Sequence, residues 1–424
     1  MQIRPYGMKL LLQLATHKFV SVRIFAMKII FQDPTFSLQL LRAIGQTYYG
    51  GADIGECLST AYRIKEGNFE SWYAEWLNTA QRVHRYAEES MLSGHKISAK
   101  DGFLRASNYY RVAGFLLVEP EDQRILDTWQ KSKECFKKAT ELFDTPVESI
   151  EIPYGEGTLP GHFYSVDTSK NPRSTLIVHG GFDSTLEELY TFAAAPALQR
   201  GYNCLTFEGP GQGAVIIKDK IPFRFDWEKV VTPVVDYALS RNEVDPIHIA
   251  LMGISMGGYL AARACAFEHR ISSCILYNGV YDGKQALETS FPKSLKKAYE
   301  DGNEGLVNMA IEILMESDPN LKFNIKHGMW TTGSSTPFEL IKKSTSFTMD
   351  GIIQNIRCPT LVLDAEKDDS FPGQPQKVYH ALKCPKNYIL FTETEGAEEH
   401  CQSGASSLSN QRIFDWLDQS FKNH

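Results

Sequence analysis

The chain has 424 residues, of which 44 are basic and 51 acidic, and therefore carries a formal net charge of -7 at pH 7. This mild acidity offers no positive field to a polyanion and argues against nucleic acid as a partner. The composition includes 43% hydrophobic residues, but no apolar run approaches the roughly 18 residues that a membrane span needs, so we expect a soluble, cytoplasmic protein with no membrane span.

The first segment, residues 1–32, is basic and apolar. It contains five Lys and Arg residues and neither Asp nor Glu. We expect an ordinary amphipathic helix that packs on its neighbours. An organelle presequence or a membrane-surface helix is the alternative for such a pattern.

Helical periodicity extends from about residue 8 to residue 143. Apolar residues recur there at intervals of three and four, as at Trp72, Trp76 and Ala80. This spacing is typical of helices with one buried face. The pattern predicts an N-terminal helical lobe over residues 1–145.

Short β-type runs begin near residue 146, and helical patterns separate most of the later ones. The last six runs are nearly continuous Val, Ile and Leu, as in strands buried on both faces. Alternation of this kind predicts an α/β fold with a mostly parallel sheet over residues 146–424. The expected strands lie at 148–152, 162–166, 175–179, 203–207, 248–252, 273–277, 360–363 and 387–391.

Residues 281–355 interrupt this alternation. They carry helical patterns and polar loops but no convincing strand. An insertion after the carboxyl end of a parallel strand lies over the ligand crevice, so we predict a helical cap there.

The strongest chemical signal is the run Gly253-Ile254-Ser255-Met256-Gly257, which follows an apolar strand and precedes a segment of small residues. A serine on such a sharp strand-to-helix turn leaves room only for glycine two residues before and after it. Its hydroxyl then projects at a helix N-terminus, where backbone donors favour an anion. Ser255 is therefore the expected nucleophile.

A serine needs a base, and three histidines follow the insertion. His380 falls in a helical pattern and His424 ends the chain, whereas His400 lies in a polar loop after the last predicted strand. A loop at the carboxyl end of a neighbouring strand is the place from which a base reaches Ser255. We predict that His400 is the general base.

The base needs a carboxylate to fix its tautomer. Asp364 stands at the end of a predicted strand, and Asp368 and Asp369 lie deeper in the loop that follows. Asp368 is better placed to reach a neighbouring histidine loop and is favoured over Asp369. The order Ser255, Asp368, His400 is that of the α/β hydrolases.

Backbone donors for an oxyanion are expected where the strand at 175–179 runs into Gly180-Gly181-Phe182. If this strand neighbours that of the elbow, the N–H groups of Gly181 or Phe182 and of Met256 form an oxyanion hole. The alternative is a purely structural glycine turn.

The run Gly209-Pro210-Gly211-Gln212-Gly213-Ala214 matches a dinucleotide fingerprint in isolation. Pro222 follows soon after and argues against a helix that opens directly from this loop, as nucleotide binding requires. The sequence also has no zinc-type spacing and no P-loop. We therefore predict no nucleotide, metal or other cofactor.

Three further residues are candidates for substrate contact. Asp282 follows the strand at 273–277 and faces either the crevice or solvent. Trp330 in the insertion and Tyr109 in the lobe either line a pocket for an aromatic substrate or take part in packing.

Five stretches together resemble one branch of the α/β hydrolases, that of bacterial 2,6-dihydroxypseudooxynicotine hydrolase and the fungal enzymes that trim polyketides in pigment and mycotoxin pathways. The stretches are the elbow, the turn at 179–183, the loop at 208–213, residues 364–374 and the lobe helix Ala106-Ser107-Asn108-Tyr109-Tyr110-Arg111.

The resemblance implies an α/β-hydrolase fold with a helical N-terminal lobe, a cap over the crevice and, often, homodimerisation through these added parts. It also implies hydrolysis of a carbon–carbon bond beside a ketone, or of an ester, without a metal or organic cofactor. Together with the residues, it predicts a serine hydrolase for a hydrophobic small molecule of polyketide type. Acyl transfer by the same triad and non-catalytic ligand binding on this fold are the alternatives.

Overall fold

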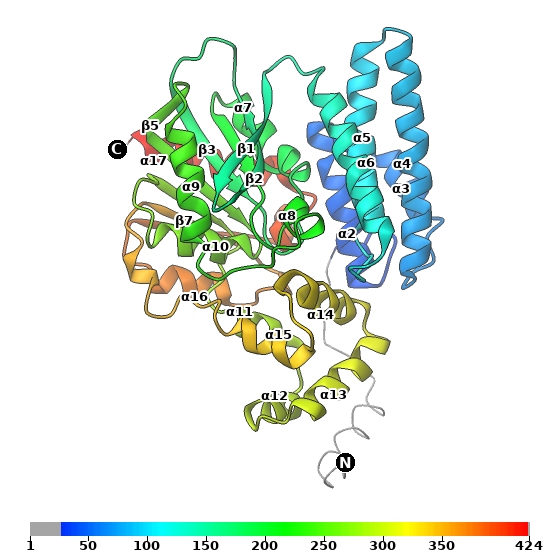
Figure 1. The fold of residues 1–424 in the computed structure, drawn as a ribbon, viewed down its shortest axis with the longest axis vertical. Coiled ribbons are helices and arrows are strands. Elements are labelled where there is room, and N and C mark those ends of the chain that lie inside the picture. The colour runs from blue at the N-terminus through cyan, green and yellow to red at the C-terminus, as the bar shows by residue number, and fades with distance from the viewer. Residues whose placement is uncertain (1–26, 423–424) are drawn as a thin grey trace.

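The protein is described by a computed structural model, in which residues 27–422 are placed. Most of the basic N-terminal segment, for which the sequence predicts an amphipathic helix, lies outside these residues. Figure 1 shows a helical lobe beside an α/β core, and a group of short helices below both. Among the described residues, no helix is long and apolar enough to cross a membrane.

The N-terminal lobe is built on helices α4 and α5, which pack side by side with α6 and the shorter α2 and α3 (Figure 1). The apolar positions of α4 face inward, so that Trp72 and Trp76 are fully buried, with ring centroids 5.8 Å apart. These are the residues whose spacing predicts the lobe. Its helices are α2 (Pro34–Gly45), η1 (Gln46–Tyr49), α3 (Ile54–Ala61), α4 (Phe69–Leu92), α5 (Lys96–Gly114) and α6 (Gln123–Thr140).

The core is an eight-stranded sheet in the order β1-β2-β4-β3-β5-β6-β7-β8. The pairs β1–β2 and β2–β4 are antiparallel and the others are parallel, so the predicted mostly parallel α/β fold is confirmed. The strands are β1 (Val147–Tyr154), β2 (Gly157–Tyr164), β3 (Arg173–His179), β4 (Asn203–Phe207), β5 (Val244–Ile254), β6 (Ser273–Tyr277), β7 (Thr360–Ala365) and β8 (Lys386–Phe391).

One expectation about burial is wrong. The last strand, β8, lies at the edge of the sheet and is not buried on both faces, and its Leu390 is 39% exposed. The apolar composition of β8 is therefore a poor guide to its burial, because an edge strand pairs with a neighbour on one side only.

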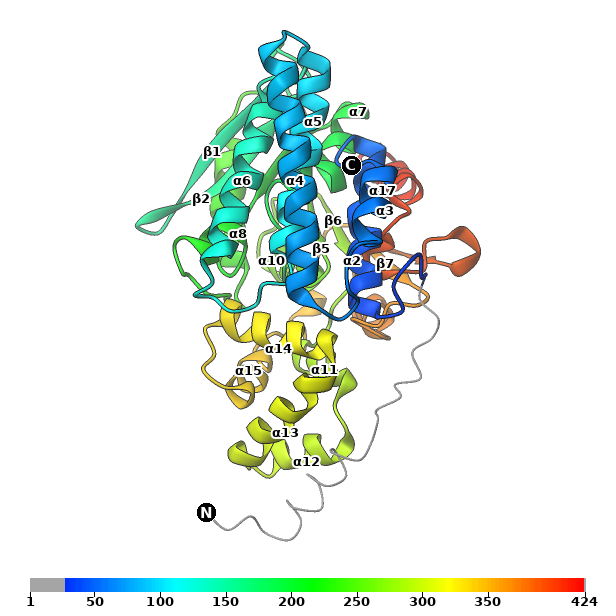
Figure 2. The same ribbon diagram turned by 90° about the vertical axis from the view of Figure 1, so that its right-hand side faces the viewer.

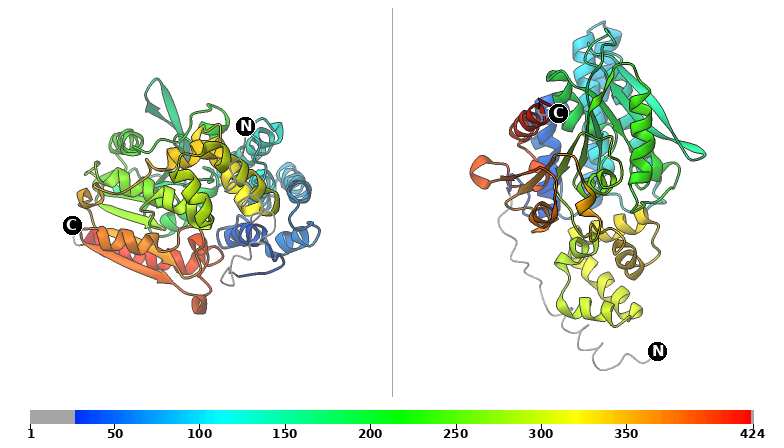
Figure 3. Two further views of the ribbon diagram at one scale, coloured as in Figure 1. Left: turned by 90° about the horizontal axis from the view of Figure 1, so that it is seen from below. Right: turned by 90° about the vertical axis from the view of Figure 1, so that its left-hand side faces the viewer.

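Helices cover both faces of the sheet. In the right-hand view of Figure 3, the red C-terminal helix α17 lies on the opposite side of the sheet from the green α9. The lobe packs on the face of α17, where Phe103 and Phe136 share one apolar cluster with strand residues and Phe414. The covering helices are α7 (Ala195–Gln199), α8 (Gly213–Ile217), α9 (Glu228–Leu239), α10 (Gly257–Cys265), α16 (Gln374–Ala381) and α17 (Ser406–Lys422), with the π-helical turn η2 (Tyr190–Ala194).

The residues inserted between β6 and β7 form a separate group of helices with an apolar cluster of their own. Figure 2 shows them below both the lobe and the sheet, with α14 nearest to the lobe. We refer to this group as the cap. It comprises α11 (Gly283–Leu287), η3 (Glu288–Ser290), α12 (Lys293–Glu300), α13 (Glu304–Ser317), α14 (Pro319–Thr332), α15 (Pro337–Ser344) and η4 (Ile353–Asn355).

Candidate active site

Ser255 stands on the turn between β5 and α10. Its φ of 61° lies in the left-handed region, which a non-glycine residue adopts at a cost. A Cβ added at Gly253 would lie 2.0 Å from the carbonyl oxygen of Gly257, and one at Gly257 would lie 2.7 Å from that of Gly180. Close backbone approach therefore requires both glycines. They allow the turn to present the Ser255 hydroxyl at the carboxyl end of the parallel strands.

Three side chains from distant parts of the chain meet at this turn. The Ser255 Oγ lies 2.9 Å from Nε2 of His400, and Nδ1 of His400 lies 2.9 Å from Oδ2 of Asp368. Asp368 follows β7 and His400 follows β8, and both are largely shielded from solvent. The carboxylate against His400 belongs to Asp368, while Asp364 accepts a hydrogen bond from Tyr388.

The electrostatics of this chain favour a charged carboxylate beside the imidazole. Burial by itself would lower the pKa of His400, but the Asp368 carboxylate raises that pKa well above its usual value. Burial would raise the pKa of Asp368, but His400 and the backbone N–H of Ser370 hold it below its usual value. Asp368 is therefore an anion that supports a proton on Nδ1 of His400 and leaves Nε2 facing Ser255.

A fourth residue, Asn278, which the sequence analysis did not select, completes this arrangement. Asn278 follows β6 directly, is fully buried, and donates from Nδ2 to Oδ2 of Asp368 at 2.6 Å. Its φ of 76° is left-handed, a conformation in which Asn and Gly are enriched. Its Oδ1 accepts from the thiol of Cys401 at 3.1 Å. A polar residue at the carboxyl end of a buried parallel strand was the available signal.

We predict that Asn278→Gly lowers kcat about tenfold or more with little change in KM. Glycine keeps the left-handed backbone, so the change removes mainly the amide that holds Asp368. A hydrogen bond to a charged group contributes about 1.5–3 kcal/mol, and 1.36 kcal/mol corresponds to tenfold in rate. Steady-state kinetics on an ester substrate measure the effect, with the exposed Asn171→Ala as control. An unchanged kcat would show that Asp368 is held without Asn278.

The turn after β3 lies against the elbow. A Cβ added at Gly181 would lie 2.8 Å from the backbone nitrogen of Met256, so the predicted donors are neighbours. The N–H of Gly181 contacts Oγ of Ser184 at 3.5 Å. The N–H groups of Phe182 and Met256 are therefore the better candidates for an oxyanion hole, with Gly181 providing the close approach.

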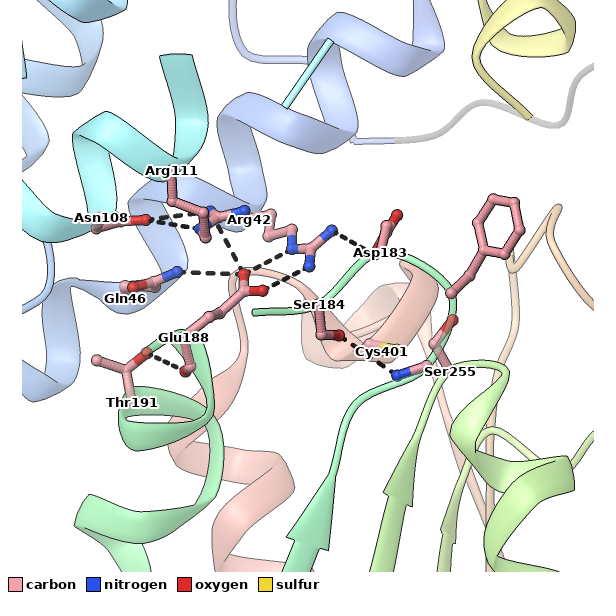
Figure 4. Close-up of polar contacts among 12 residues, drawn as sticks. Arg42, Gln46, Asn108, Arg111, Asp183, Ser184, Glu188, Thr191, Ser255 and Cys401 are labelled. Atoms are coloured by element: carbon pink, nitrogen blue, oxygen red, sulfur yellow. Dashed lines mark hydrogen bonds and ion pairs between the residues drawn. The ribbon is translucent and has the colours of Figure 1, made fainter. Parts of the chain in front are cut away.

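This turn is held from three sides. From the lobe, Arg42 reaches Asp183 at 3.1 Å, as Figure 4 shows. From the cap, His327 donates from Nε2 to the carbonyl oxygen of Phe182 at 3.0 Å; burial lowers its pKa, which favours the neutral imidazole. From the core, Gln212 donates to the carbonyl oxygens of Gly180 and Gly181 at 2.8 and 3.1 Å. The lobe and the cap thus both determine where the turn lies.

The glycine-rich loop after β4 braces the same turn. Glu208 is buried and accepts from the backbone N–H groups of Leu186 and Ala214 at 2.6 and 2.8 Å. Burial raises its pKa to about 8. The prediction that no helix opens from this loop is wrong, because α8 begins at Gly213. Helix α8 is only five residues long and ends before Pro222. A proline at that distance permits a short helix but would interrupt a longer one.

A pocket of about 670 Å³, a volume that includes its open mouth, lies between the lobe, the cap helix α14 and the turn after β3. Its polar wall includes Arg111, Asp183 and Ser184. Its other walls are mainly apolar and aromatic, and they include Phe115, Leu117, Ile125, Trp129, Phe182 and Trp330. A cavity with this lining suits a hydrophobic small molecule held by a few polar groups.

The three predicted substrate contacts have different positions. Trp330 lines the pocket. Tyr109 is buried inside the lobe, where its hydroxyl donates to Glu56 at 2.7 Å, so its role is packing. Asp282 caps α11 by accepting from the N–H of Gln285 at 2.8 Å, and it does not line the pocket.

A mostly parallel sheet with a serine on a strand-to-helix elbow, and a histidine and an aspartate after later strands, defines the α/β-hydrolase class. Residues 175–385 match the family described as Alpha/beta hydrolase family. The hydrolase LUC6 of Fusarium sp is 36% identical over 414 residues, which cover 92% of this chain and 98% of the relative. The 20-hydroxy-prefusarin hydrolase FUS2 of Gibberella moniliformis is 34% identical, over 92% and 98% of the two chains.

The chain belongs to the α/β-hydrolase family and is an enzyme of the hydrolase type. Among solved structures, that of 2,6-dihydroxy-pseudo-oxynicotine hydrolase superposes with a TM-score of 0.71 at 22% identity, covering 88% of this chain and 94% of the other. The similarity extends beyond the sheet to the lobe and the cap, since a core alone would not give this coverage. The predicted family resemblance and fold class are confirmed.

Proposed function

We propose that this protein is a serine hydrolase that cleaves an ester, or a carbon–carbon bond beside a ketone, in a hydrophobic secondary metabolite of polyketide type. Ser255 is the nucleophile, His400 the general base and acid, and Asp368 the carboxylate that orients His400. The observation that carries the proposal is the continuous hydrogen-bonded chain from Ser255 Oγ to His400 and on to Asp368, with both links at 2.9 Å.

The proposed reaction begins with a carbonyl carbon placed against Ser255 Oγ. His400 takes the hydroxyl proton on Nε2 as Oγ attacks, and the carbonyl oxygen gains negative charge. The N–H groups of Phe182 and Met256 stabilise that charge, at the N-terminus of α10. The imidazolium of His400 then protonates the leaving group, an alkoxide for an ester or a carbanion stabilised as an enolate for a 1,3-diketone.

A water molecule then hydrolyses the acyl-enzyme, and the proton transfers run in the reverse order. His400 removes a proton from a water molecule, which attacks the acyl carbon bonded to Ser255 Oγ. Collapse of the second tetrahedral intermediate returns the proton to Ser255 and releases a carboxylic acid. Both bond types therefore require the same side chains, and they differ only in the leaving group.

Two observations support the proposed substrate class. The pocket beside the turn after β3 has mainly apolar and aromatic walls, as a hydrophobic molecule requires. The relative FUS2, which is 34% identical to this chain, is named as the hydrolase of 20-hydroxy-prefusarin.

Product analysis with a matched pair of compounds tests the proposal. We expect the purified protein to hydrolyse p-nitrophenyl butyrate or the 1,3-diketone benzoylacetone, with one carboxylic acid formed per bond broken. Mass spectrometry in water enriched in ¹⁸O should show the label in that acid. Failure to turn over either compound, together with no labelling of Ser255 by a fluorophosphonate, would overturn the proposal. In the presence of an added alcohol, an ester product instead of acid would identify a transferase.

A further inference from the structure

The lobe helix α5 carries a run, Ser107-Asn108-Tyr109-Tyr110-Arg111, whose last residue has no role in the proposed reaction. Arg111 is only 6% exposed, and Figure 4 shows it on the lobe helix beside Arg42 and Glu188. Its Nε and Nη2 donate to Oδ1 of Asn108 at 3.3 and 3.1 Å. Its Nη1 is buried and has no hydrogen-bond partner among residues 27–422. The two N–H groups of Nη1 therefore need an explanation, because buried hydrogen-bond donors nearly always have an acceptor.

The carboxylates near Arg111 are held mainly by Arg42. Glu188 is held by Arg42 in a two-pronged contact, with Nε and Nη2 at 2.7 and 2.6 Å from its two oxygens. Arg42 also binds Asp183 at 3.1 Å, so that one guanidinium takes both carboxylates. Arg111 reaches Glu188 only at 3.4 Å. Figure 4 shows this unequal sharing, with Glu188 between the two arginines and Asp183 beyond Arg42.

The pKa values of the two arginines agree with this difference. For Arg42, burial would lower the pKa, but Glu188 and Asp183 raise it above its usual value. For Arg111, burial lowers the pKa to about 10, and the pull of Glu188 does not compensate. The positive charge of Arg111 is therefore the less compensated of the two, and an additional anion beside it would restore the balance.

Arg111 also lies in the wall of the pocket described above, together with Asp183, Ser184 and the aromatic rings. The rings continue from the lobe to the cap, because Phe115 stacks on Phe323 with centroids 4.8 Å apart, and Phe323 stacks on His327 at 5.1 Å. A ligand in this pocket lies between flat apolar walls and a cationic group. Phe182, which carries one of the proposed oxyanion donors, lies in the wall of this pocket, whereas Ser255, Met256, Asp368 and His400 are not among its lining residues.

We propose that Arg111 anchors a carboxylate of the substrate, and that the substrate class is a flat, hydrophobic acid whose reacting carbonyl lies on the Ser255 side of the turn. The inference rests on the proposed function, because it describes a part of the molecule that Ser255 attacks. The unpartnered Nη1 of a charged guanidinium suits a carboxylate, whose oxygen accepts a charge-assisted hydrogen bond from it. Asp183 does not repel this group strongly, since Arg42 neutralises it.

The test compares two ligands of nearly the same shape, cinnamate and its neutral amide cinnamamide, by titration calorimetry at pH 7.5. Both are titrated into full-length Ser255→Ala protein, in which no turnover occurs. We expect cinnamate to bind at least about tenfold more tightly than cinnamamide. Arg111→Gln should remove this preference. Arg111→Lys, which keeps the positive charge but replaces the planar guanidinium with a shorter, differently placed ammonium donor, should reduce it. Arg124→Gln removes a guanidinium from the more exposed pair with Glu70 in the same lobe and should leave it intact.

Equal affinity for the two ligands, or a preference that survives in both Arg111 variants, would overturn the inference. If Arg111→Gln does not fold, the comparison of ligands in the unaltered pocket and in Arg111→Lys still decides it. Fluorophosphonate labelling of Ser255 in protein with Arg111→Gln alone gives an independent readout. Retained labelling shows that the variant keeps its active site. Labelled protein with Arg111 intact that binds the two ligands equally would mean that this inference fails while the proposed hydrolase function stands.

Discussion

Replacing Ser255 with alanine is expected to lower kcat/KM by about 10³-fold or more for any substrate that the protein hydrolyses. The change removes the hydroxyl that forms the bond to the acyl carbon, while the turn, His400 and the oxyanion donors remain. Removal of a triad serine leaves only the catalysis that the oxyanion hole and binding provide. The measurement is initial-rate hydrolysis of p-nitrophenyl butyrate by wild-type and variant protein at equal concentration.

A matched control is Ser240→Ala, which removes an exposed hydroxyl that bonds to the carbonyl oxygen of Tyr237. This variant should keep wild-type activity and wild-type labelling by a fluorophosphonate, whereas Ser255→Ala should not be labelled. Hydrolysis at an undiminished rate by Ser255→Ala would remove Ser255 from the mechanism and leave His400 to activate water directly.

The second large effect is expected at Asp368. We predict that Asp368→Asn lowers kcat by about 10⁴-fold, because an amide can donate to Nδ1 of His400 and so stabilise the wrong tautomer. Asp369→Asn changes the neighbouring carboxylate in the same loop and should stay within a few-fold of wild type. Rate measurements on the two variants decide between the two aspartates, which the sequence left as alternatives.

The pH profile supplies a separate readout for the same pair. His400 must be neutral to accept a proton, and Asp368 raises the pKa of His400, so wild-type kcat/KM should fall as the pH drops through that raised pKa. Without the carboxylate the pKa falls, so the acid limb of the profile should move to lower pH in Asp368→Asn. An acid limb that stays in place would mean that another group titrates there.

The lobe and the cap have a direct connection to the proposed chemistry. Arg42 from the lobe and His327 from the cap hold neighbouring residues of the turn that carries the oxyanion donors. Donors of this kind stabilise charge only when they are fixed before the reaction. The added parts of the chain therefore contribute to the geometry of the site and also form its pocket.

The sequence predicted what short-range packing and strand order determine. The glycines around Ser255 indicate a close backbone approach, which every elbow of this kind requires. The aliphatic runs indicate strands that helices cover. The loops of Asp368 and His400 follow β7 and β8. Parallel pairing of these strands alone brings both loops to the carboxyl end of the sheet, where Ser255 lies. For these residues, the position relative to the predicted strands was enough to predict which side chains meet.

Only the tertiary structure decided which polar groups face one another across these elements. Asn278 holds Asp368 from the end of another strand, Tyr109 bonds inside the lobe, and Arg111 lines a pocket that the turn after β3 also lines, with Nη1 unpaired among the described residues. Asn, Tyr and Arg occur in helices and loops for many reasons, so residue type and spacing do not reveal the partner. The physical reason is that hydrogen bonds and ion pairs act over a few ångströms, whereas the groups they join are separated by tens to hundreds of residues.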